Sequence, residues 1–395
     1  MKKQFLRSLV FTLSITGSIA GVWGSASAEV TPPFDVLARE AYLLDLSTNT
    51  VLFEKNAYAL MPPASMSKLM TVYMVFEALA NGEFALEDTF PVSEKAWRMQ
   101  GSKMFVGLKE NISIADLLRG VIVQSGNDAC IVLAEGIAGS EEFFAEMMTD
   151  KAQSIGLTGS TFANATGWPH EEHMMTAHDL ARLAQLLVEE FPEYYRLFAE
   201  KSFTYGVSLD GKPITQPNRN PILGSIEGAD GLKTGHTEAS GYGLTASAER
   251  DGRRLVLVLN GLNSVRQRSI SSERFLQWGF RNFDTYEVFK AGDIVDEAPV
   301  WLGEQAMVPL VIADDLTLTL TRRDRRKMTA SIAYTSPIPA GIMKGTPIAR
   351  LVLEGPDMGT RTIPLLAGAD IEKVGPFGKI GSAIEFLLLG KSGSQ

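Results

Sequence analysis

Pro62-Pro63-Ala64-Ser65-Met66-Ser67-Lys68-Leu69-Met70 is the stretch that opens an apolar helical pattern. Ser65 and Lys68 are three residues apart, and we expect the first turn of this helix to carry both. Residues at i and i+3 share one helix face, so the lysine amine can reach the serine hydroxyl. Because a desolvated lysine can take the proton of a serine, the pair indicates a nucleophile and its base. An N-cap serine followed by a solvated lysine is the alternative.

Two further stretches favour the catalytic interpretation. Gln124-Ser125-Gly126-Asn127-Asp128 is a polar turn between two apolar runs. Asp230-Gly231-Leu232-Lys233-Thr234-Gly235-His236-Thr237 precedes a run of alternating residues at 242–248. The order S-x-x-K, then S-x-N, then K-T-G is the signature of penicillin-binding proteins and class A β-lactamases.

The resemblance extends beyond these three motifs. The segments 124–130, 230–237 and 278–283 resemble the low-molecular-mass penicillin-binding proteins, and among these the chain is similar to the serine-type D-alanyl-D-alanine carboxypeptidases. The likeness runs from about Phe34 to the C-terminal segment. It implies a penicillin-binding-protein/β-lactamase-like transpeptidase domain, with an antiparallel sheet and helices, followed by a small all-β domain.

The resemblance assigns a role to each catalytic candidate. Ser65 is expected to be the nucleophile, and Lys68 its base if burial and a second cation, Lys233, lower its pKa. The expected proton path runs from Ser65 through Lys68 and Ser125 to the leaving nitrogen. Asn127 is expected either to hold a substrate carbonyl or to orient Lys68.

We expect the K-T-G motif and one arginine to bind the substrate. The resemblance places Thr234, Gly235 and His236 at the substrate, with the backbone N–H groups of Ser65 and His236 as the oxyanion hole. Arg268 matches the family arginine that binds a terminal carboxylate, for which a guanidinium is well suited. Nearby Arg266 is a competitor for this role.

The order of patterns predicts an α+β first domain. A hairpin is expected from 41–46 and 51–54, then a loop bordering the site at 86–107, and then several helices. Lys233–Gly235 is expected to edge a strand that continues through 242–248 and returns at 254–260, with a closing helix at 271–283.

After Asp284 the pattern consists of short strand-like runs punctuated by Gly and Pro. We expect a signal peptide at 1–28, a catalytic domain at 29–285, a small all-β domain at 286–375 and an amphipathic tail at 376–395. The charged start, apolar run and Ala26-Ser27-Ala28 are typical of an exported protein. By resemblance, the tail is expected to contact the outer face of the cytoplasmic membrane, and packing on its own domain is the alternative.

Composition excludes several other classes of function. The net charge of −9 disfavours nonspecific nucleic-acid binding. One cysteine, Cys130, excludes an intramolecular disulfide, and its place on an apolar helix favours a buried role. His170, His173 and His178 lack the spacing of a zinc motif, so no metal and no cofactor are expected.

Three alternatives remain beside a carboxypeptidase that acts on peptidoglycan stem peptides and is acylated by β-lactams. A D,D-endopeptidase has the same motifs. A β-lactamase is disfavoured, because no E-x-x-L-N stretch lies between Asn127 and Lys233. A non-catalytic peptidoglycan-binding scaffold is disfavoured because all three motifs are intact.

Overall fold

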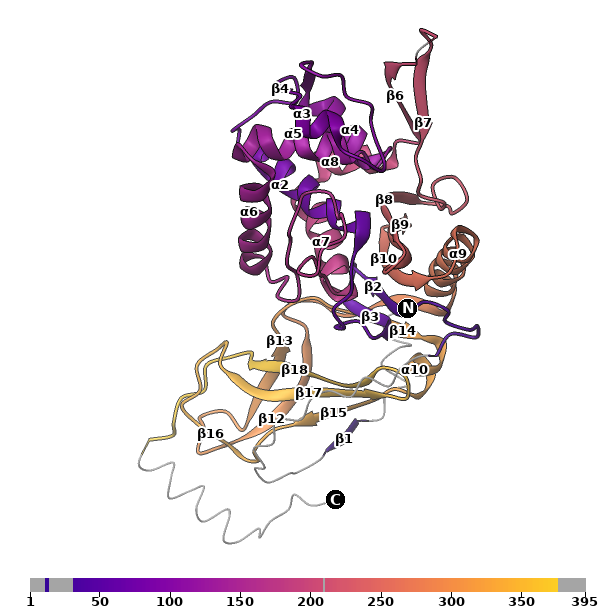
Figure 1. The fold of residues 1–395 in the computed structure, drawn as a ribbon. Coiled ribbons are helices and arrows are strands. Elements are labelled where there is room, and N and C mark those ends of the chain that lie inside the picture. Colours follow the sequence, from indigo (N-terminus) through magenta and orange to yellow (C-terminus); the bar gives the residue numbers. More distant parts are fainter. Residues whose placement is uncertain (1–10, 14–30, 209, 376–395) are drawn as a thin grey trace. The chain divides into compact units, whose positions relative to one another are not determined.

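A computed structural model describes residues 11–13, 31–208 and 210–375 (Figure 1). Within these ranges, residues 31–281 form one compact unit. Residues 282–375 form a second unit together with 11–13. The predicted signal peptide at 1–28, apart from 11–13, and the predicted tail at 376–395 lie outside the described residues.

The first unit is built on a five-stranded antiparallel sheet of order β3-β2-β10-β9-β8. Its strands are β2 (Glu40–Asp45), β3 (Thr50–Lys55), β8 (Ala229–Thr237), β9 (Gly241–Arg250) and β10 (Arg253–Leu262). Strands from both ends of this unit therefore meet in one sheet, which confirms the predicted α+β class. A hairpin turn at Asp251-Gly252 joins β9 to β10.

Both faces of this sheet are covered, so β2 is buried along its whole length. Leu43 lies beside Gly279 of helix α9 (Val265–Asn282). Tyr42 and Leu44 belong to the large core on the opposite face, because successive strand residues point to opposite sides. Helix α7 (Ala177–Glu190) packs there against β2 and β10, and Figure 1 shows α7 and α9 on opposite sides of the sheet.

Helices and small hairpins fill the sequence between β3 and β8. The helical segments are η1 (Ala64–Ser67), α2 (Lys68–Ala80), α3 (Glu94–Arg98), α4 (Ile114–Ile122), α5 (Asn127–Ala138), α6 (Glu141–Ser154), α7, α8 (Pro192–Tyr195) and η2 (Arg196–Ala199). The hairpins are β4 (Thr89–Pro91) with β5 (Asn111–Ser113), and β6 (Ser202–Val207) with β7 (Pro213–Pro217).

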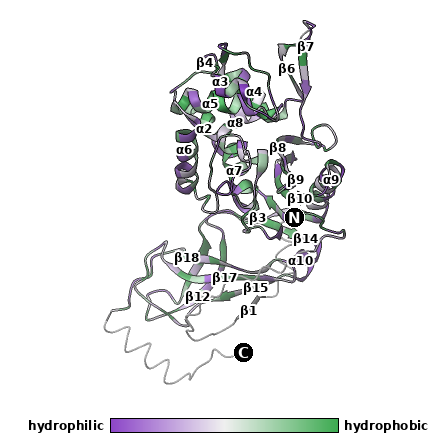
Figure 2. Ribbon diagram, viewed as in Figure 1, coloured by the Kyte–Doolittle hydropathy of each residue, from purple (hydrophilic) through white to green (hydrophobic). Residues whose placement is uncertain are grey.

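Local sequence explains where several of these helices begin. The side chains of Ser93, Ser113, Ser140 and Thr176 each accept a hydrogen bond from the third residue of the following helix. This satisfies a backbone N–H that has no partner inside the helix. Helix α2 is apolar on nearly every side because it is buried among the others, and Figure 2 maps this hydropathy on the ribbon.

The structure corrects four details of the predicted order. Ser65 lies in the short turn η1, three residues before α2 begins at Lys68. The segment 86–107 is not wholly loop, since it contains β4 and α3. The K-T-G strand does not continue through 242–248, because a turn separates β8 from β9. Helix α9 starts six residues earlier than 271, at Val265.

The second unit is a set of mainly antiparallel strands with a small apolar core, which confirms the predicted all-β fold. Its strands are β11 (Phe283–Phe289), β12 (Ile294–Trp301), β13 (Met307–Ile312), β14 (Leu316–Thr321), β15 (Thr329–Ala333), β16 (Ile338–Pro339), β17 (Pro347–Gly355) and β18 (Gly359–Ala367), with β1 (Phe11–Leu13) beside β15. The helical turn α10 (Arg322–Lys327) was not expected. Its charged sequence carries no apolar period, and the Thr321 side chain caps it.

Within the residues that the structure describes, no helix is both long and apolar enough to span a bilayer. The predicted boundaries of the signal peptide, the two domains and the tail stay predictions.

Candidate active site

The turn that carries Ser65 brings its hydroxyl to Lys68. Residues at i and i+3 of a 3₁₀ turn eclipse one another, so η1 aligns the two side chains more directly than an α-turn does. The Lys68 Nζ donates a hydrogen bond of 2.8 Å to the Ser65 Oγ. Ala64 enters the turn with φ of 49°, a left-handed conformation that an alanine adopts at a cost.

Lys68 is fully buried, and burial lowers the pKa of its ammonium to about 8. The Nζ also donates to Asn127 Oδ1, at 2.7 Å, and to the backbone carbonyl of Thr166. The charge of Arg219 lowers the pKa of Lys68 further, while Asp128 acts in the opposite direction. A lysine with such a pKa is neutral often enough near pH 8 to accept the serine proton.

A second lysine contacts the second serine. Ser125 lies in the turn between α4 and α5 with φ of 60°, and its Oγ accepts a 2.8 Å hydrogen bond from Lys233 Nζ. Burial lowers the pKa of Lys233 well below its ordinary value, and the charge of Lys68 lowers it further. The charge of Lys68 thus acts on Lys233, but the cation that lowers the pKa of Lys68 is Arg219 and not the expected Lys233. Arg219 acts on both lysines, and the sequence did not indicate it.

Asn127 ties Lys68 to the loop that follows α3. While its Oδ1 accepts from Lys68, its Nδ2 donates 2.8 Å to the carbonyl oxygen of Gln100. Its backbone N–H donates 2.8 Å to the carbonyl oxygen of Ser102. In this geometry the amide orients Lys68, which is one of the two roles expected for it. The loop borders the site as expected.

The K-T-G strand β8 lies directly against the Ser65 turn. A Cβ on Gly235 would lie 2.8 Å from the carbonyl oxygen of Pro63 and 3.0 Å from Met66 Cγ. Only glycine allows the strand to come so close. Thr234, one residue earlier, is buried, and the exposed ring of His236 stacks on Tyr242 with centroids 3.9 Å apart.

Arg268 and its competitor Arg266 have different surroundings. Arg268 is 7% exposed, and its guanidinium carbon lies 5.8 Å from the centroid of the Tyr242 ring. Its Nε is buried and has no hydrogen-bond partner within the described residues. Arg266 is exposed. A buried guanidinium with an unused donor is suited to an incoming carboxylate, because that bond would satisfy it.

Two residues of the site were not among the candidates named from the sequence. Arg219 Nη1 donates 2.5 Å to Ser102 Oγ, and its charge acts on both lysines. Asp128 is buried, and its carboxylate accepts from the backbone N–H of Met104 at 2.8 Å and of Phe105 at 2.9 Å. Its position directly after Asn127 is a signal for Asp128, whereas Arg219 follows no pattern that marks it.

Cys130 is fully buried, and burial raises the pKa of its thiol to about 12. No group of three or more His, Cys, Asp or Glu side chains in the described ranges could hold a metal ion.

Two family models match the chain. Residues 26–263 match the family model for D-alanyl-D-alanine carboxypeptidase. Residues 283–373 match the model for the C-terminal domain of penicillin-binding protein 5. The two matches account for both units of the chain in sequence order.

The chain is 36% identical over 351 residues to the D-alanyl-D-alanine carboxypeptidase DacC of Escherichia coli, covering 87% of this chain and 86% of that protein. The structure of penicillin-binding protein 5 from Haemophilus influenzae superposes with a TM-score of 0.74 at 34% identity, covering 87% of this chain and all of that one. Penicillin-binding protein D2 from Listeria monocytogenes, solved with ampicillin bound, is 28% identical with a TM-score of 0.57, covering 64% of this chain and all of that one. This chain therefore belongs to the D-alanyl-D-alanine carboxypeptidase family.

Proposed function

We propose that this chain removes the terminal D-alanine from peptidoglycan stem peptides through an acyl ester on Ser65, and that penicillins acylate the same oxygen. The observation that carries the proposal is the buried Lys68 amine, which lies 2.8 Å from the Ser65 Oγ. Its pKa of about 8 lets it take a proton from the serine and give it up again.

Acylation then proceeds in two steps, the attack by Ser65 and the departure of D-alanine. Lys68 takes the hydroxyl proton while Ser65 Oγ forms a bond to the carbonyl carbon of the penultimate D-alanine. The oxyanion forms beside the backbone N–H groups of Ser65 and His236. When the C–N bond breaks, the leaving amine receives the proton by way of Ser125, and D-alanine departs. Water later attacks the ester while Lys68 accepts its proton, and Lys68 returns that proton to Ser65 Oγ as the bond between the acyl carbon and this oxygen breaks.

The grip on the leaving group distinguishes this reaction from cleavage within a chain. The free carboxylate of the terminal D-alanine would lie between the hydroxyl of Thr234 and the buried guanidinium of Arg268. The unused Nε of Arg268 supports this role. A charge-assisted hydrogen bond to a carboxylate also explains why a cation is retained in a largely buried position.

The first test incubates the protein with a penicillin and locates the adduct by intact mass and peptide digestion. We expect one adduct per chain, on Ser65, and none in Ser65→Ala. A D-alanine release assay on a D-Ala-D-Ala peptide then measures the carboxypeptidase reaction, which Ser65→Ala should slow by roughly 10⁴-fold or more.

Each alternative gives a different result in the same assays. A D,D-endopeptidase would cut crosslinked dimers faster than it releases D-alanine. A β-lactamase would consume many penicillin molecules per chain without a lasting adduct. A non-catalytic scaffold would give neither an adduct nor D-alanine, and that result would reject the proposal.

The proposal includes an exported location. The signal-peptide pattern at 1–28 supports an extracytoplasmic protein, and the amphipathic pattern at 376–395 supports contact with the outer face of the cytoplasmic membrane. Fractionation of cells that make the full chain, compared with one ending at Val374, tests the second point. Recovery of both proteins in the soluble fraction would reject membrane contact.

A further inference from the structure

Helix α10 in the second unit carries five cations within six residues. Its sequence is Arg-Arg-Asp-Arg-Arg-Lys, and the acid in it, Asp324, is buried, while the five cations are exposed. We name these five side chains the α10 cluster: Arg322, Arg323, Arg325, Arg326 and Lys327. Because the whole chain has a net charge of −9, the cluster is a local reversal of the prevailing charge.

Three members of the α10 cluster have no partner for their charge. Arg323 pairs with Asp357 at 3.1 Å, and the guanidinium carbon of Arg325 lies 4.6 Å from the centroid of the Tyr286 ring. The members whose side chains form neither an ion pair nor a hydrogen bond within the described part of the chain are Arg322, Arg326 and Lys327. Their charges are therefore available to a ligand.

The fold itself gains little from these charges. Positions three and four apart on a helix are neighbours, so Arg322 lies beside Arg325 and Arg326, and like charges at these spacings repel each other. Arg322 also lies in the first turn, where the helix dipole disfavours a cation. A cluster that opposes its own helix indicates an anionic partner outside the unit.

The cluster extends from a fixed support. The Thr321 side chain caps α10, and the buried Asp324 carboxylate accepts backbone hydrogen bonds from Asp357 at 2.8 Å and Met358 at 3.2 Å. These bonds join the helix to the turn between β17 and β18, two strands that Figure 1 shows beside α10. Since the helix is already held in place, little backbone order has to be gained when a ligand binds.

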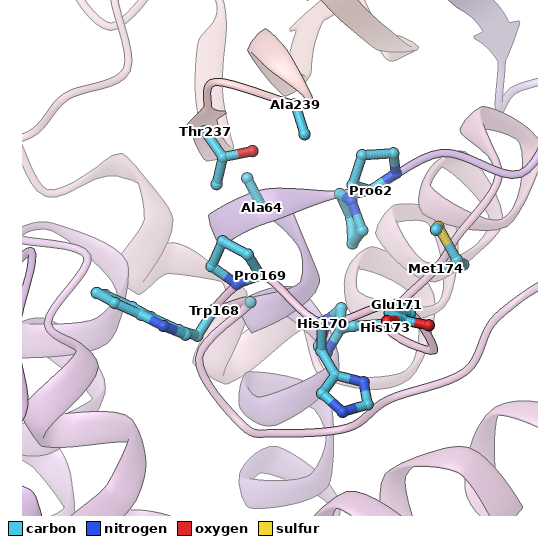
Figure 3. A pocket seen from close by; sticks show the side chains of 12 residues that line it. Pro62, Ala64, Trp168, Pro169, His170, Glu171, His173, Met174, Thr237 and Ala239 are labelled. Carbon is cyan, nitrogen blue, oxygen red and sulfur yellow. The ribbon is translucent and has the colours of Figure 1, made fainter.

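The pocket beside the Ser65 turn in the first unit can hold only a short segment of a polymer. Its volume is about 410 Å³, within the ordinary range for one small ligand, and Figure 3 shows the side chains that line it. The lining contains neither lysine nor arginine. A polymer with many anionic groups therefore needs a further cationic surface if more than one of its segments is to be bound.

We propose that the α10 cluster binds peptidoglycan, through carboxylates of stem peptides other than the one at Ser65. The inference rests on the proposed function, which identifies the polymer. Each stem peptide that ends in D-Ala-D-Ala has a free carboxylate, and such stems recur along the polymer. A guanidinium fork matches a carboxylate, and four of the five cations are arginines. Binding at the cluster would raise the concentration of stem peptides around the catalytic unit.

Anionic lipids offer a similar charge, but the geometry of the second unit favours the polymer. The cluster lies at the turn that precedes Gly359, the first residue of β18, because Arg323 pairs with Asp357 there. Strand β18 then runs to Ala367, and the described chain continues from that opposite end to Gly375. The two ends of β18 are roughly 26 Å apart at about 3.3 Å per residue. A membrane bound through the segment after Gly375 would thus be distant from the cluster compared with a Debye length of about 8 Å.

The first experiment measures how much protein sediments with insoluble peptidoglycan. Ser65→Ala is the background for every sample, so that turnover does not alter the polymer. The cluster variant adds Arg322→Gln, Arg326→Gln and Lys327→Gln. The control variant instead replaces three exposed lysines elsewhere in the same unit: Lys290→Gln, Lys344→Gln and Lys373→Gln. Both variants lose three cations and therefore have the same net charge, and both keep Thr321 and Asp324, which hold α10.

The cluster variant should bind peptidoglycan about tenfold more weakly, because each exposed charge pair is worth up to roughly fivefold in affinity. The control variant should bind as the background does. Chemical amidation of the peptidoglycan carboxylates should remove the difference between the two variants. Equal binding by both variants, an equal loss in both, or a difference that survives amidation would overturn the proposal.

Vesicles test the lipid alternative directly. We expect no cluster-dependent binding to phosphatidylglycerol vesicles beyond that to phosphatidylcholine vesicles. Cluster-dependent binding to phosphatidylglycerol, together with none to peptidoglycan, would overturn the proposal and assign the cluster to a membrane.

Kinetics with Ser65 restored separate failure of this surface from failure of the proposed function. The cluster variant should release D-alanine more slowly from intact peptidoglycan and keep the kcat/KM of the unmodified protein for a soluble D-Ala-D-Ala peptide. Equal losses on the two substrates would overturn a role in polymer binding. If neither substrate releases D-alanine and penicillin leaves no adduct on Ser65, the proposed function is rejected, whereas sedimentation of the Ser65→Ala proteins still decides whether the cluster binds peptidoglycan.

Discussion

Both units bury a carboxylate that accepts backbone hydrogen bonds, Asp128 in the first and Asp324 in the second, but among the described residues only the first unit also buries lysines. The first unit encloses two lysines, Lys68 and Lys233, whose charges repel each other. The buried polar side chains of the second unit, among the residues described, are Thr319, Thr321 and Asp324. The contrast is between charges that oppose folding and polar groups that assist it.

Partners explain the contrast. The Asp324 carboxylate accepts hydrogen bonds from the backbone N–H of Asp357 at 2.8 Å and of Met358 at 3.2 Å, and it follows the N-cap Thr321. These bonds hold a turn and a helix end. Lys68 has no carboxylate among its hydrogen-bond partners, and a buried charge so placed costs stability. A buried charge that lowers stability is retained when the reaction needs it. We therefore infer that the reaction takes place in the first unit.

The largest expected effect comes from removing the base. Lys68→Met keeps the shape of the side chain and removes its proton acceptor, so D-alanine release should fall by roughly 10³-fold, within the range of general-base catalysis. Stability should change little, because removal of the buried cation offsets the loss of its hydrogen bonds to Asn127 and Thr166. Steady-state kinetics and thermal unfolding measure the two quantities; a large loss of stability would contradict the contrast.

The next effect concerns the carboxylate grip. Arg268→Ala should lower kcat/KM for a peptide with a free C-terminus by about 10- to 100-fold, the worth of a hydrogen bond to a charged group. The same peptide with an amidated C-terminus should lose much less. Arg266→Ala, an exposed neighbour two residues away, is the control and should leave both rates unchanged. An equal loss of kcat/KM for the two peptides would show that Arg268 does not bind the terminal carboxylate.

In the second unit the expected effect is on stability alone. Asp324→Ala leaves buried N–H groups without acceptors, so the free energy of unfolding of that unit should fall by about 1–3 kcal/mol. D-Alanine release should be unchanged at temperatures where the unit stays folded. Urea unfolding and kinetics test both statements, and a lowered kcat below the unfolding transition would break the comparison.

The smallest expected effect is a shift in the midpoint of the pH profile. Lys68 must be neutral to act, and its pKa is about 8, so kcat/KM should rise with pH up to about 8 and then level off. Below that value each pH unit should cost about tenfold in rate. Arg219 lowers this pKa, so Arg219→Ala should raise it and move the midpoint to higher pH. Lys212→Ala removes an exposed cation paired with Asp210 and should leave the midpoint in place.

Sequence alone was sufficient where one local pattern places a side chain. The spacing of Ser65 and Lys68 brings their side chains together in any helical turn. The strand pattern at Lys233 fixes the direction in which the Lys233 side chain points. Fold class followed from strand patterns at both ends of the first unit. What remained beyond reach depends on contacts between distant segments: Arg219 comes to the site from a stretch without periodicity, and its hydrogen bond to Ser102 spans 117 positions.

Two predicted element boundaries were wrong for local steric reasons. The left-handed Ala64 starts a 3₁₀ turn, and so the α-helix begins only at Lys68. Gly241, with φ of 69°, enters β9 after a turn, which the alternating pattern on either side did not mark. In both cases the backbone leaves the ordinary regions at one residue, and side-chain patterns carry little information about such a change.

The rate at which the single cysteine is labelled can report how often the core opens. Cys130 lies one helical turn after Asn127, fully enclosed, so a thiol-specific reagent can reach it only when the surrounding helices separate. The rate of labelling under native conditions therefore reports how often the catalytic core opens. If Cys130 is labelled more slowly after acylation of Ser65, the ratio of the two rates measures how much the bound acyl group stabilises that core.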